Sequence, residues 1–480
     1  MFKSEGARYE FSERSVGLAY GGIAAMHGLM QGLSVPDEIN SALHLLKVHV
    51  PYWESDHVLS IAYNSLCGGT CLDDLERLRN DEAYVRALGA DRIPDPTTSG
   101  DFCRRFDAAA VESLQDAFNK TRLRVWQQQP KSFFREAVVD VDGTLVETTG
   151  ECKEGMDISY DGKWGYQTLL VSFANTREPL FLYNRPGNRP SHEGAAHYLD
   201  RAVSLCEEAG FERILLRGDT DFSQTTHLDR WDKRGVSFVF GYDANPKLKG
   251  IAEELPASAW TPLSRKRKYE VKTSTRAKPE RVKEKVIQQR EFVNIKLVRE
   301  HVAEFEYKPR ACRQPYRMVV VRKQLKVLKG QQELREEVRH LFYITNDFDM
   351  PARSVVKNAN DRCEQENLID QGKNGVCSLR APLDNLVSNW AYMVMASLAW
   401  SIKAWAALVL PETGRWRDKH RTEKWDVVRM EFKQFINEFI RMPALLISTG
   451  RQIVLRLLSW SRKQHVFLRL LDVLDHPLLC

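Results

Sequence analysis

Residues 138–144 read Val-Val-Asp-Val-Asp-Gly-Thr, an apolar run that includes two carboxylates, Asp140 and Asp142. Side chains alternate between the two faces of a strand, so both carboxylates share one face and the pattern does not say which binds a ligand. A second apolar run, residues 214–217, leads directly into Gly218 and Asp219. Either run alone is also compatible with an acidic turn or a helix cap. Because α/β sheets commonly build their sites at strand ends, the two runs together predict an α/β sheet with an acidic site.

Strands and helices alternate around these two runs. Stretches rich in β-branched and aromatic residues predict strands, and the apolar periodicity of Glu193–Ala209 predicts a helix. The predicted strands are Glu136–Val141, Thr168–Phe173, Leu180–Tyr183, Ile214–Arg217 and Val236–Gly241. This alternation indicates a core built on a mixed α/β sheet.

The chain has 480 residues, which exceeds one hydrophobic core, since domains usually hold about 100 to 200 residues. Short amphipathic helices predict a helical domain over residues 1–130, and a capped helix start within it makes DNA binding one interpretation of this domain. The α/β core is predicted at 131–244 and again at 346–411, interrupted by a β-rich basic insertion at 245–345. Residues 412–480 are predicted to form a C-terminal helical region.

The cysteines and apolar segments favour a folded protein in the cytoplasm. The nine cysteines are scattered, and the close pair Cys67 and Cys71 has no second pair at the spacing of a zinc site, so we interpret both as buried thiols. The first residues lack the apolar segment of a secretory signal. The apolar stretch Trp390–Leu410 is interrupted by Lys403, and we interpret it as a core helix and not a membrane span.

Lysine and arginine gather in a few stretches, although the formal net charge is only +6. Such clusters indicate a polyanionic partner, but they also occur on ordinary solvated faces. Arg104 and Arg105 follow a capped helix start at Thr97–Asp101, which predicts either a helix-turn-helix DNA reader or plain helix packing. A phosphate-binding surface or a flexible basic loop is predicted where the densest basic segment begins, at Arg265, Lys266, Arg267 and Lys268.

A third acidic segment is predicted to be helical and to present alternating charges. At about 100° per residue, Arg362, Glu366 and Lys373 fall within roughly 40° of one another on a regular helix. One face would then carry a cation, a carboxylate and a cation. Taken alone, this pattern is also explained by an ordinary salt bridge on a solvated face.

Two-metal chemistry gives a reason to combine the three acidic segments. Cleavage of a phosphodiester by two metal ions needs several carboxylates that converge on ions roughly 4 Å apart. Hard oxygen ligands favour Mg²⁺ or Mn²⁺, and two ions per site are expected. Nearby cations such as Arg362 and Lys373 suit the binding of phosphates.

With these residues in place, the sequence resembles the Asp-Asp-Glu insertion-sequence transposases of DDE group 1, which have an RNase H-like core. Their third block is a Tyr, an Arg three positions later, a Glu four positions after that and a Lys seven positions further on. Arg362, Glu366 and Lys373 match the last three of these, and Ala359 stands in the Tyr position, where it removes a phosphate-contacting hydroxyl.

The first two blocks of that family are also matched. Its apolar strand ending in Asp, any residue and Thr resembles residues 142–144, and its Arg-Gly-Asp block followed by a Phe resembles residues 217–222. The resemblance therefore names Asp142, Asp219 and Glu366 as the catalytic, metal-binding carboxylates. The gap between Asp219 and Glu366 also looks like the family's β insertion.

The resemblance implies a function and partners. It implies a bacterial enzyme of the cytoplasm and nucleoid that cuts double-stranded DNA at terminal inverted repeats and joins the ends to target DNA. It also implies a homodimer on DNA, and no membrane. Trp231 or Trp260 could stack on a flipped base, although a buried core position is the alternative for each.

Two rival functions stand beside this one. Residues 140–145 resemble the nucleophile motif of haloacid-dehalogenase-like phosphatases, in which Asp140 would be the nucleophile and Asp142 the acid or base. That motif normally opens its domain, whereas here it follows a long helical region. The second rival is a transposon-derived DNA-binding protein that no longer cuts.

Overall fold

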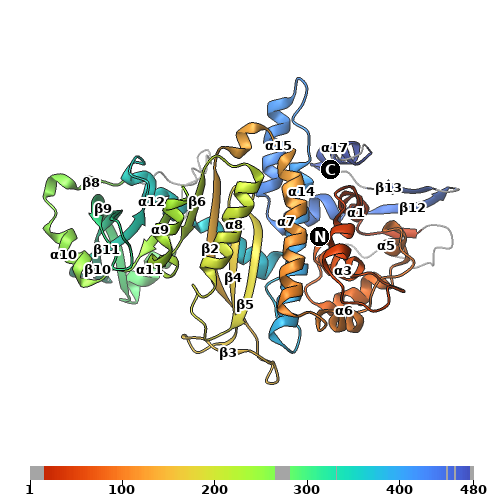
Figure 1. Cartoon of the computed structure of the whole chain (residues 1–480), viewed down its shortest axis with the longest axis horizontal. Coiled ribbons are helices and arrows are strands. Elements are labelled where there is room, and N and C mark those ends of the chain that lie inside the picture. Colours follow the sequence, from red (N-terminus) through yellow and green to blue (C-terminus); the bar gives the residue numbers. More distant parts are fainter. Residues whose placement is uncertain (1–15, 265–281, 331, 450–451, 459–460, 476–480) are drawn as a thin grey trace. The chain divides into compact units, whose positions relative to one another are not determined.

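The computed structural model describes residues 16–264, 282–330, 332–449, 452–458 and 461–475, and these divide into two compact units. Unit 1 comprises residues up to Ala137, residues 142–212 and the chain from Glu364 onward. Unit 2 comprises residues 138–141 and 213–363. Figure 1 labels many of the elements of both.

Unit 1 holds an antiparallel part of the sheet. Its strands are β2 (Ala137–Glu147), β3 (Asp157–Ile158), β4 (Trp164–Phe173) and β5 (Glu178–Pro186). The order is β3, β4, β2, and β5 pairs antiparallel with β4, with Thr168 opposite Asn184. A separate three-stranded sheet joins β1 (Val16–Leu18) to a hairpin of β12 (Ala444–Thr449) and β13 (Gln452–Leu457).

Helices supply the rest of unit 1. Those that precede β5 are α1 (Ile23–Gly32), α2 (Val35–Ala42), α3 (Glu54–Leu66), α4 (Leu75–Arg79), α5 (Glu82–Ala87), α6 (Pro96–Cys103) and α7 (Ala108–Gln127). Those that follow it are α8 (Ala195–Ala209), α13 (Cys363–Asp370), α14 (Leu386–Leu408), α15 (Arg417–Arg429), α16 (Phe432–Phe435) and α17 (Gln464–Leu474). Two π-helical turns are η5 (Gln371–Gly375) and η6 (Ile436–Ile440).

Helix α14 is the centre of unit 1. It packs against β5, α3, α7 and α15, and it lies beside α7 in Figure 1. Among the helices that the structure describes, it alone is long and apolar enough to cross a membrane, and its apolar window is entirely buried inside the protein. It is therefore the core helix that the sequence predicts.

A buried ion pair ties α7, β5 and α14 together. Arg122 Nε donates to Glu178 Oε1 over 3.0 Å, and both side chains are almost fully buried. The indoles of Trp126 and Trp405 donate to the same carboxylate at 3.3 and 2.9 Å. Several donors thus offset the desolvation of Glu178, as a buried charge requires.

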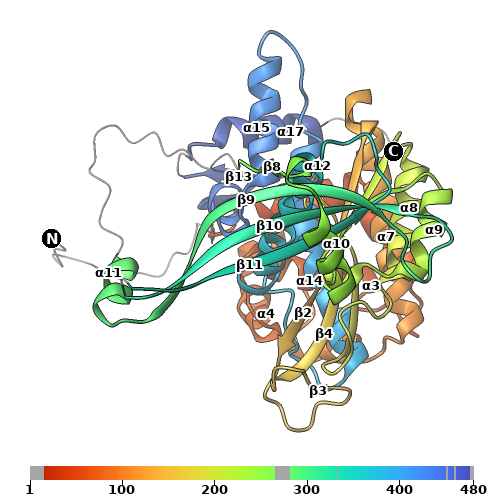
Figure 2. The ribbon, with the colours of Figure 1, turned by 90° about the vertical axis from the view of Figure 1, so that its left-hand side faces the viewer.

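Unit 2 extends a parallel strand pair with a long antiparallel arm. Its strand order is β2, β6 (Ile214–Gly218), β7 (Ser237–Tyr242), β11 (Gln332–Thr345), β10 (Tyr316–Lys329), β9 (Val293–Tyr307) and β8 (Thr261–Pro262). β6 and β7 are parallel, and β11 joins β7 antiparallel with Phe342 opposite Tyr242. The insertion therefore continues the sheet of unit 2, and Figure 2 shows its three long strands side by side.

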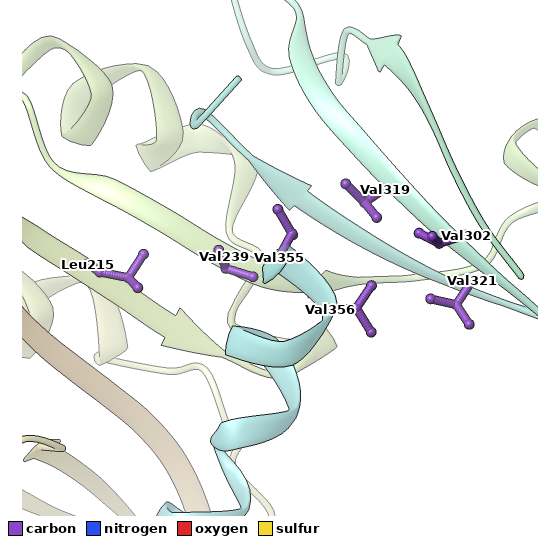
Figure 3. Close-up of a cluster of buried hydrophobic side chains, with 7 residues drawn as sticks. All are labelled: Leu215, Val239, Val302, Val319, Val321, Val355 and Val356. Carbon is purple, nitrogen blue, oxygen red and sulfur yellow. The ribbon is translucent and has the colours of Figure 1, made fainter. Parts of the chain in front are cut away.

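Helix α12 (Ala352–Asp361) closes the core of unit 2. The other helices of unit 2 are α9 (Thr225–Lys233), α10 (Pro246–Glu254) and α11 (Val282–Gln289). Val355 and Val356 of α12 pack on valines and a leucine from β6, β7, β9 and β10, as Figure 3 shows. The apolar face of α12 thus covers one face of the sheet, whereas the alternate residues of the strands point to the other face.

The predicted fold class, a mixed α/β sheet with a β-rich insertion between helical ends, is confirmed. The five predicted strands and the helix at residues 193–209 are also confirmed. The C-terminal helical region additionally contains the β12–β13 hairpin, which the sequence reading does not predict. The five domain ranges stay a prediction.

Removing one partner of the Arg122–Glu178 pair tests its contribution. Arg122→Met leaves a buried carboxylate without its cation, so we expect the free energy of unfolding to fall by about 3–5 kcal/mol in denaturant titrations. The matched control is Arg79→Met, because Arg79 pairs with Glu76 on the surface at 3.2 Å, where such pairs contribute about 0–1 kcal/mol. Equal losses in the two variants would contradict the interpretation.

Candidate active site

Asp140 and Arg217 form a buried bidentate ion pair in unit 2. Arg217 Nε lies 2.6 Å from Asp140 Oδ1, and Nη2 lies 2.7 Å from Oδ2. The third nitrogen, Nη1, donates to the Asn358 carbonyl at 3.2 Å. Asp140 is only 1% exposed, so both of its oxygens are committed to the guanidinium. Asp140 is therefore a structural residue, and it is not available as the nucleophile of a phosphatase.

Asp142 lies two residues further along β2, in unit 1, and is half-buried. Its Oδ1 accepts a hydrogen bond from the Gly143 amide at 2.8 Å. A Cβ at position 143 would lie 3.0 Å from Gln167 Nε2 and 3.1 Å from Ser191 Cβ. The glycine after Asp142 therefore allows close packing that a larger residue would disturb.

Asp219 directly follows the last residue of β6, in unit 2. Its Oδ1 accepts from the Asp221 amide at 3.0 Å, and its Oδ2 lies 3.7 Å from Arg362 Nη1. Burial raises the pKa of Asp219 above its usual value near 3.8, and Arg362 opposes this shift. The side chain is 35% exposed, which leaves it open to solvent and ligands.

Close packing around Gly218 explains why a glycine stands in the middle of the Arg-Gly-Asp motif. A Cβ there would lie 2.8 Å from Phe222 Cβ and 3.0 Å from Val141 Cγ1. The absence of a side chain lets the strand end pack against both residues, and Asp219 follows at once. Each position of the motif thus has a physical role.

The third acidic segment is not one regular helix, so that prediction is wrong. α12 ends at Asp361, a turn at Arg362 follows, and α13 continues into the π-helical turn η5. The Val376 amide donates to the Gln371 carbonyl in that turn. A π turn changes the angular position of the residues that follow, so the shared face calculated for a regular helix does not extend to Lys373.

Gln365, which sequence reasoning missed, positions Glu366. The Gln365 side chain is buried and donates to the Leu170 carbonyl of β4 at 3.1 Å, while Ser172 donates to its Oε1. Glu364 on its other side pairs with Arg177 at 3.0 Å. These anchors hold α13 against the sheet of unit 1, and Glu366 is exposed. The positioning role of Gln365 could not be predicted, because nothing in a single sequence distinguishes a buried glutamine next to the motif glutamate from an exposed one.

Lys373 lines a pocket of about 450 Å³ in unit 1, together with Glu147 and Arg380. Burial lowers the pKa of Lys373, and Glu147 opposes that shift. Lys373 is thus half-buried and accessible from the pocket, as a residue that contacts a phosphate needs to be.

The other predicted basic residues have different surroundings. Arg104 pairs with Asp101 and Asp384, each at 3.0 Å, and Arg105 donates to the Leu45 carbonyl at 3.4 Å. The helix before them, α6, is capped by Asp95. Arg265, Lys266, Arg267 and Lys268 lie outside the described residues.

The remaining aromatic and thiol candidates are mostly core residues. Trp231 is fully buried, and its ring centroid lies 5.8 Å from that of Phe240. Trp260 is 7% exposed, and Arg322 stacks on its ring. Cys67 is a buried free thiol as predicted, whereas Cys71 is only half-buried.

In the part of the chain that the structure describes, no three His, Cys, Asp or Glu residues form a group able to hold an ion. Asp142 and Glu366 belong to unit 1, and Asp219 belongs to unit 2. All three offer carboxylate oxygens, the donors that Mg²⁺ and Mn²⁺ prefer.

Comparison with known proteins identifies the family. The model described as transposase DDE domain group 1 matches residues 19–477, so the chain belongs to this transposase family. Seven chains of solved structures match, among them the piggyBac transposase synaptic complex with hairpin DNA. That match has 11% identity and a TM-score of 0.37, and it covers 88% of this chain and 81% of the other. No curated protein matches the sequence.

The different roles of the two carboxylates of β2 can be tested by stability. Asp140→Asn leaves the buried Arg217 guanidinium without its counter-ion, so we expect a loss of about 3–5 kcal/mol in the free energy of unfolding. Asp142→Asn is the matched control on the same face of the strand and should change it by about 0.5 kcal/mol or less. A larger loss for the control would reverse our assignment of the two residues.

Asp219 gives a prediction with a defined pH dependence. Because its folded pKa is raised, the charged form is disfavoured in the folded state. Asp219 therefore adds to the free energy of unfolding at pH values below its pKa in the unfolded chain. This contribution is lost as the pH rises through its pKa in the folded protein. At pH 7 we therefore expect Asp219→Asn to unfold about 1–2 °C above the wild type, as a partly exposed site allows. The difference should vanish in melts near pH 3, and Asp221→Asn serves as the control.

Proposed function

We propose that this transposase cuts DNA at the terminal inverted repeats of its own element and joins the ends to target DNA, as bacterial insertion sequences do. Asp142, Asp219 and Glu366 are the proposed catalytic residues and the ligands of two Mg²⁺ or Mn²⁺ ions. The observation that carries this proposal is the Asp140–Arg217 pair. It removes Asp140 from the candidates and leaves Asp142 as the accessible carboxylate of the first block.

The surroundings of the three carboxylates support this assignment. Asp142 is half-buried, Asp219 is 35% exposed and Glu366 is exposed, so each can reach a ligand from outside the core. A pair of ions held by these carboxylates would supply activation of a water or 3′-hydroxyl nucleophile and stabilisation of charge on the leaving oxygen. The carboxylates must be deprotonated to act as ligands, so binding competes with protons.

Neighbouring cations complete the proposed site. Arg362 lies 3.7 Å from Asp219 and favours its anionic form. We assign Arg362 and Lys373 to the scissile DNA strand, where a guanidinium and an ammonium bind phosphate oxygens. Arg104 and Arg105 are weaker candidates for DNA, because carboxylates and a backbone carbonyl already bind them.

The proposed partners follow from the same chemistry. Double-stranded DNA is the substrate, a homodimer on DNA would bring two element ends together, and the cytoplasm and nucleoid are the expected location. The basic balance of the chain, with 70 Lys and Arg against 64 Asp and Glu, favours a polyanion. Light scattering of the protein with and without end DNA would test the dimer.

Cleavage and strand transfer test the catalytic assignment. On a labelled duplex that carries the inverted repeats flanking the reading frame, we expect Mg²⁺-dependent products from the wild type. Glu366→Gln, Asp142→Asn and Asp219→Asn should each lower the rate by about a thousandfold, since a lost metal ligand removes several kcal/mol of stabilisation. Asp370→Asn and Asp221→Asn are neighbouring controls that should keep activity.

Two outcomes would refute the proposal. Products that persist at wild-type rate in Glu366→Gln would remove that residue from the site. A wild type that binds end DNA without cutting it in Mg²⁺ or Mn²⁺ would instead indicate a DNA-binding protein that has lost its activity.

A further inference from the structure

Three aligned side chains on the insertion arm form a polar cluster under an indole. Arg322 of β10 stands opposite His301 of β9 and opposite His340 of β11 in the strand register. Trp260, just before β8, places its ring 4.0 Å from the Arg322 guanidinium carbon. The ring centroids of Trp260 and His340 are 6.3 Å apart. All four side chains belong to unit 2.

The cluster lies on the face of the sheet away from α12. Val321, the residue before Arg322, belongs to the apolar core under α12. Neighbouring residues of a strand point to opposite faces, so Arg322 and its two register partners project from the other face. The cluster is thus separate from the core.

Within the described part of the chain, each of these side chains has a buried nitrogen without a hydrogen-bond partner. Trp260 Nε1, His301 Nδ1, Arg322 Nε and His340 Nε2 make no hydrogen bond to any residue that the structure describes. A buried polar group without a partner destabilises the folded state, so four in one cluster favour the presence of a ligand. The indole and guanidinium N–H groups are donors only, and each imidazole nitrogen is a donor in one tautomer. The cluster therefore favours a ligand that accepts hydrogen bonds.

The charge of the cluster favours an anion. Among the described residues, no carboxylate forms an ion pair with Arg322, which is held by its contact with Trp260. Burial lowers the pKa of His340, Glu253 of α10 raises it, and Arg322 and Lys249 lower it further. One acid and one base of α10 thus offset each other near His340, and the net charge comes from Arg322.

We infer that Trp260, His301, Arg322 and His340 bind a phosphate of the DNA backbone. A stacked guanidinium is well suited to this ligand, because its planar N–H groups match phosphate oxygens while the indole fixes its orientation. Phosphate contacts position a protein on DNA and carry no base specificity. This inference assigns a role to residues of the insertion that lie outside the proposed catalytic site, and it rests on the proposal that DNA is the substrate.

The strand register relates this cluster to the end of β6. Gly218 pairs with Phe240 of β7, which places Asp219 level with Gly241 and, across β7, with Tyr343 of β11. His340 lies three residues further in the direction in which β6 ends, ~10 Å at the usual strand rise. Arg217 contacts α12 through the Asn358 carbonyl, so Asp219, two residues further on, belongs to the face of the sheet opposite the cluster. DNA bound at the cluster would therefore make a contact separate from the proposed catalytic carboxylates.

The salt dependence of DNA binding by the full chain tests the inference. Without divalent ions, fluorescence anisotropy of a labelled 30-base-pair duplex gives the slope of log K against log salt. Arg322→Gln should weaken binding about tenfold and reduce the slope by about 0.9, the loss of one phosphate contact. Arg339→Gln is the matched control, since it removes the same charge from the same arm, but at a residue paired with Glu337 at 2.6 Å.

Further variants separate binding from folding. Trp260→Phe keeps a ring under the guanidinium and removes the N–H, so it should weaken binding about threefold with an unchanged slope. If Arg322→Gln does not fold, Trp260→Phe and His340→Gln decide the question. Wild-type affinity in both would overturn the inference, as would equal effects of Arg322→Gln and Arg339→Gln.

Inorganic phosphate distinguishes a free anion from DNA. At constant ionic strength, phosphate could raise the melting temperature of the wild type and leave that of Arg322→Gln unchanged. If the salt slope of DNA binding is then the same in both proteins, the cluster binds a free anion and the DNA assignment is overturned. Because no metal is present, cleavage does not enter the measurement. If the wild type cuts DNA but Arg322→Gln has the same salt slope as the wild type, only this inference is refuted. If Arg322→Gln has a reduced salt slope but the wild type does not cut DNA, only the proposed cleavage is refuted.

Discussion

The buried pair of Asp140 and Arg217 is the constraint on which the first two acidic blocks depend. Two charges taken out of water each lose several kcal/mol of hydration, and only close bidentate geometry offsets that loss. The pair therefore fixes how β2 lies beside β6 within unit 2. Since Gly218 and Asp219 follow Arg217 directly, the same constraint determines where the chain leaves the strand.

The third block depends on a different device. Gln365 binds backbone and hydroxyl groups of β4, and the turn at Arg362 and the π turn at η5 break the helix on either side. Such irregular turns are frequent at functional sites, because they point side chains in directions that a regular helix cannot. The exposed position of Glu366 results from this buried neighbour.

The sequence was sufficient for the strands and insufficient for the details of the site. Apolar runs such as residues 214–217 predict strands because burial and side-chain alternation act locally. The choice between Asp140 and Asp142 needed Arg217, which lies far along the chain and reveals its partner only after folding. The helical calculation for Lys373 failed because one extra residue in a turn changes the phase, and no local pattern announces a π turn. The hairpin of β12 and β13 was missed because its short apolar runs also fit helices.

The central position of α14 has a consequence for synthesis on the ribosome. This helix packs against β5 and α7, yet it is encoded about 200 residues after β5 and about 260 residues after α7. At about 5–20 residues per second, the apolar surfaces of β5 and α7 remain without this partner for roughly 10–50 s. A nascent or truncated chain that ends before Leu386 lacks its core helix, so shortened copies of the gene would yield products prone to aggregation and degradation.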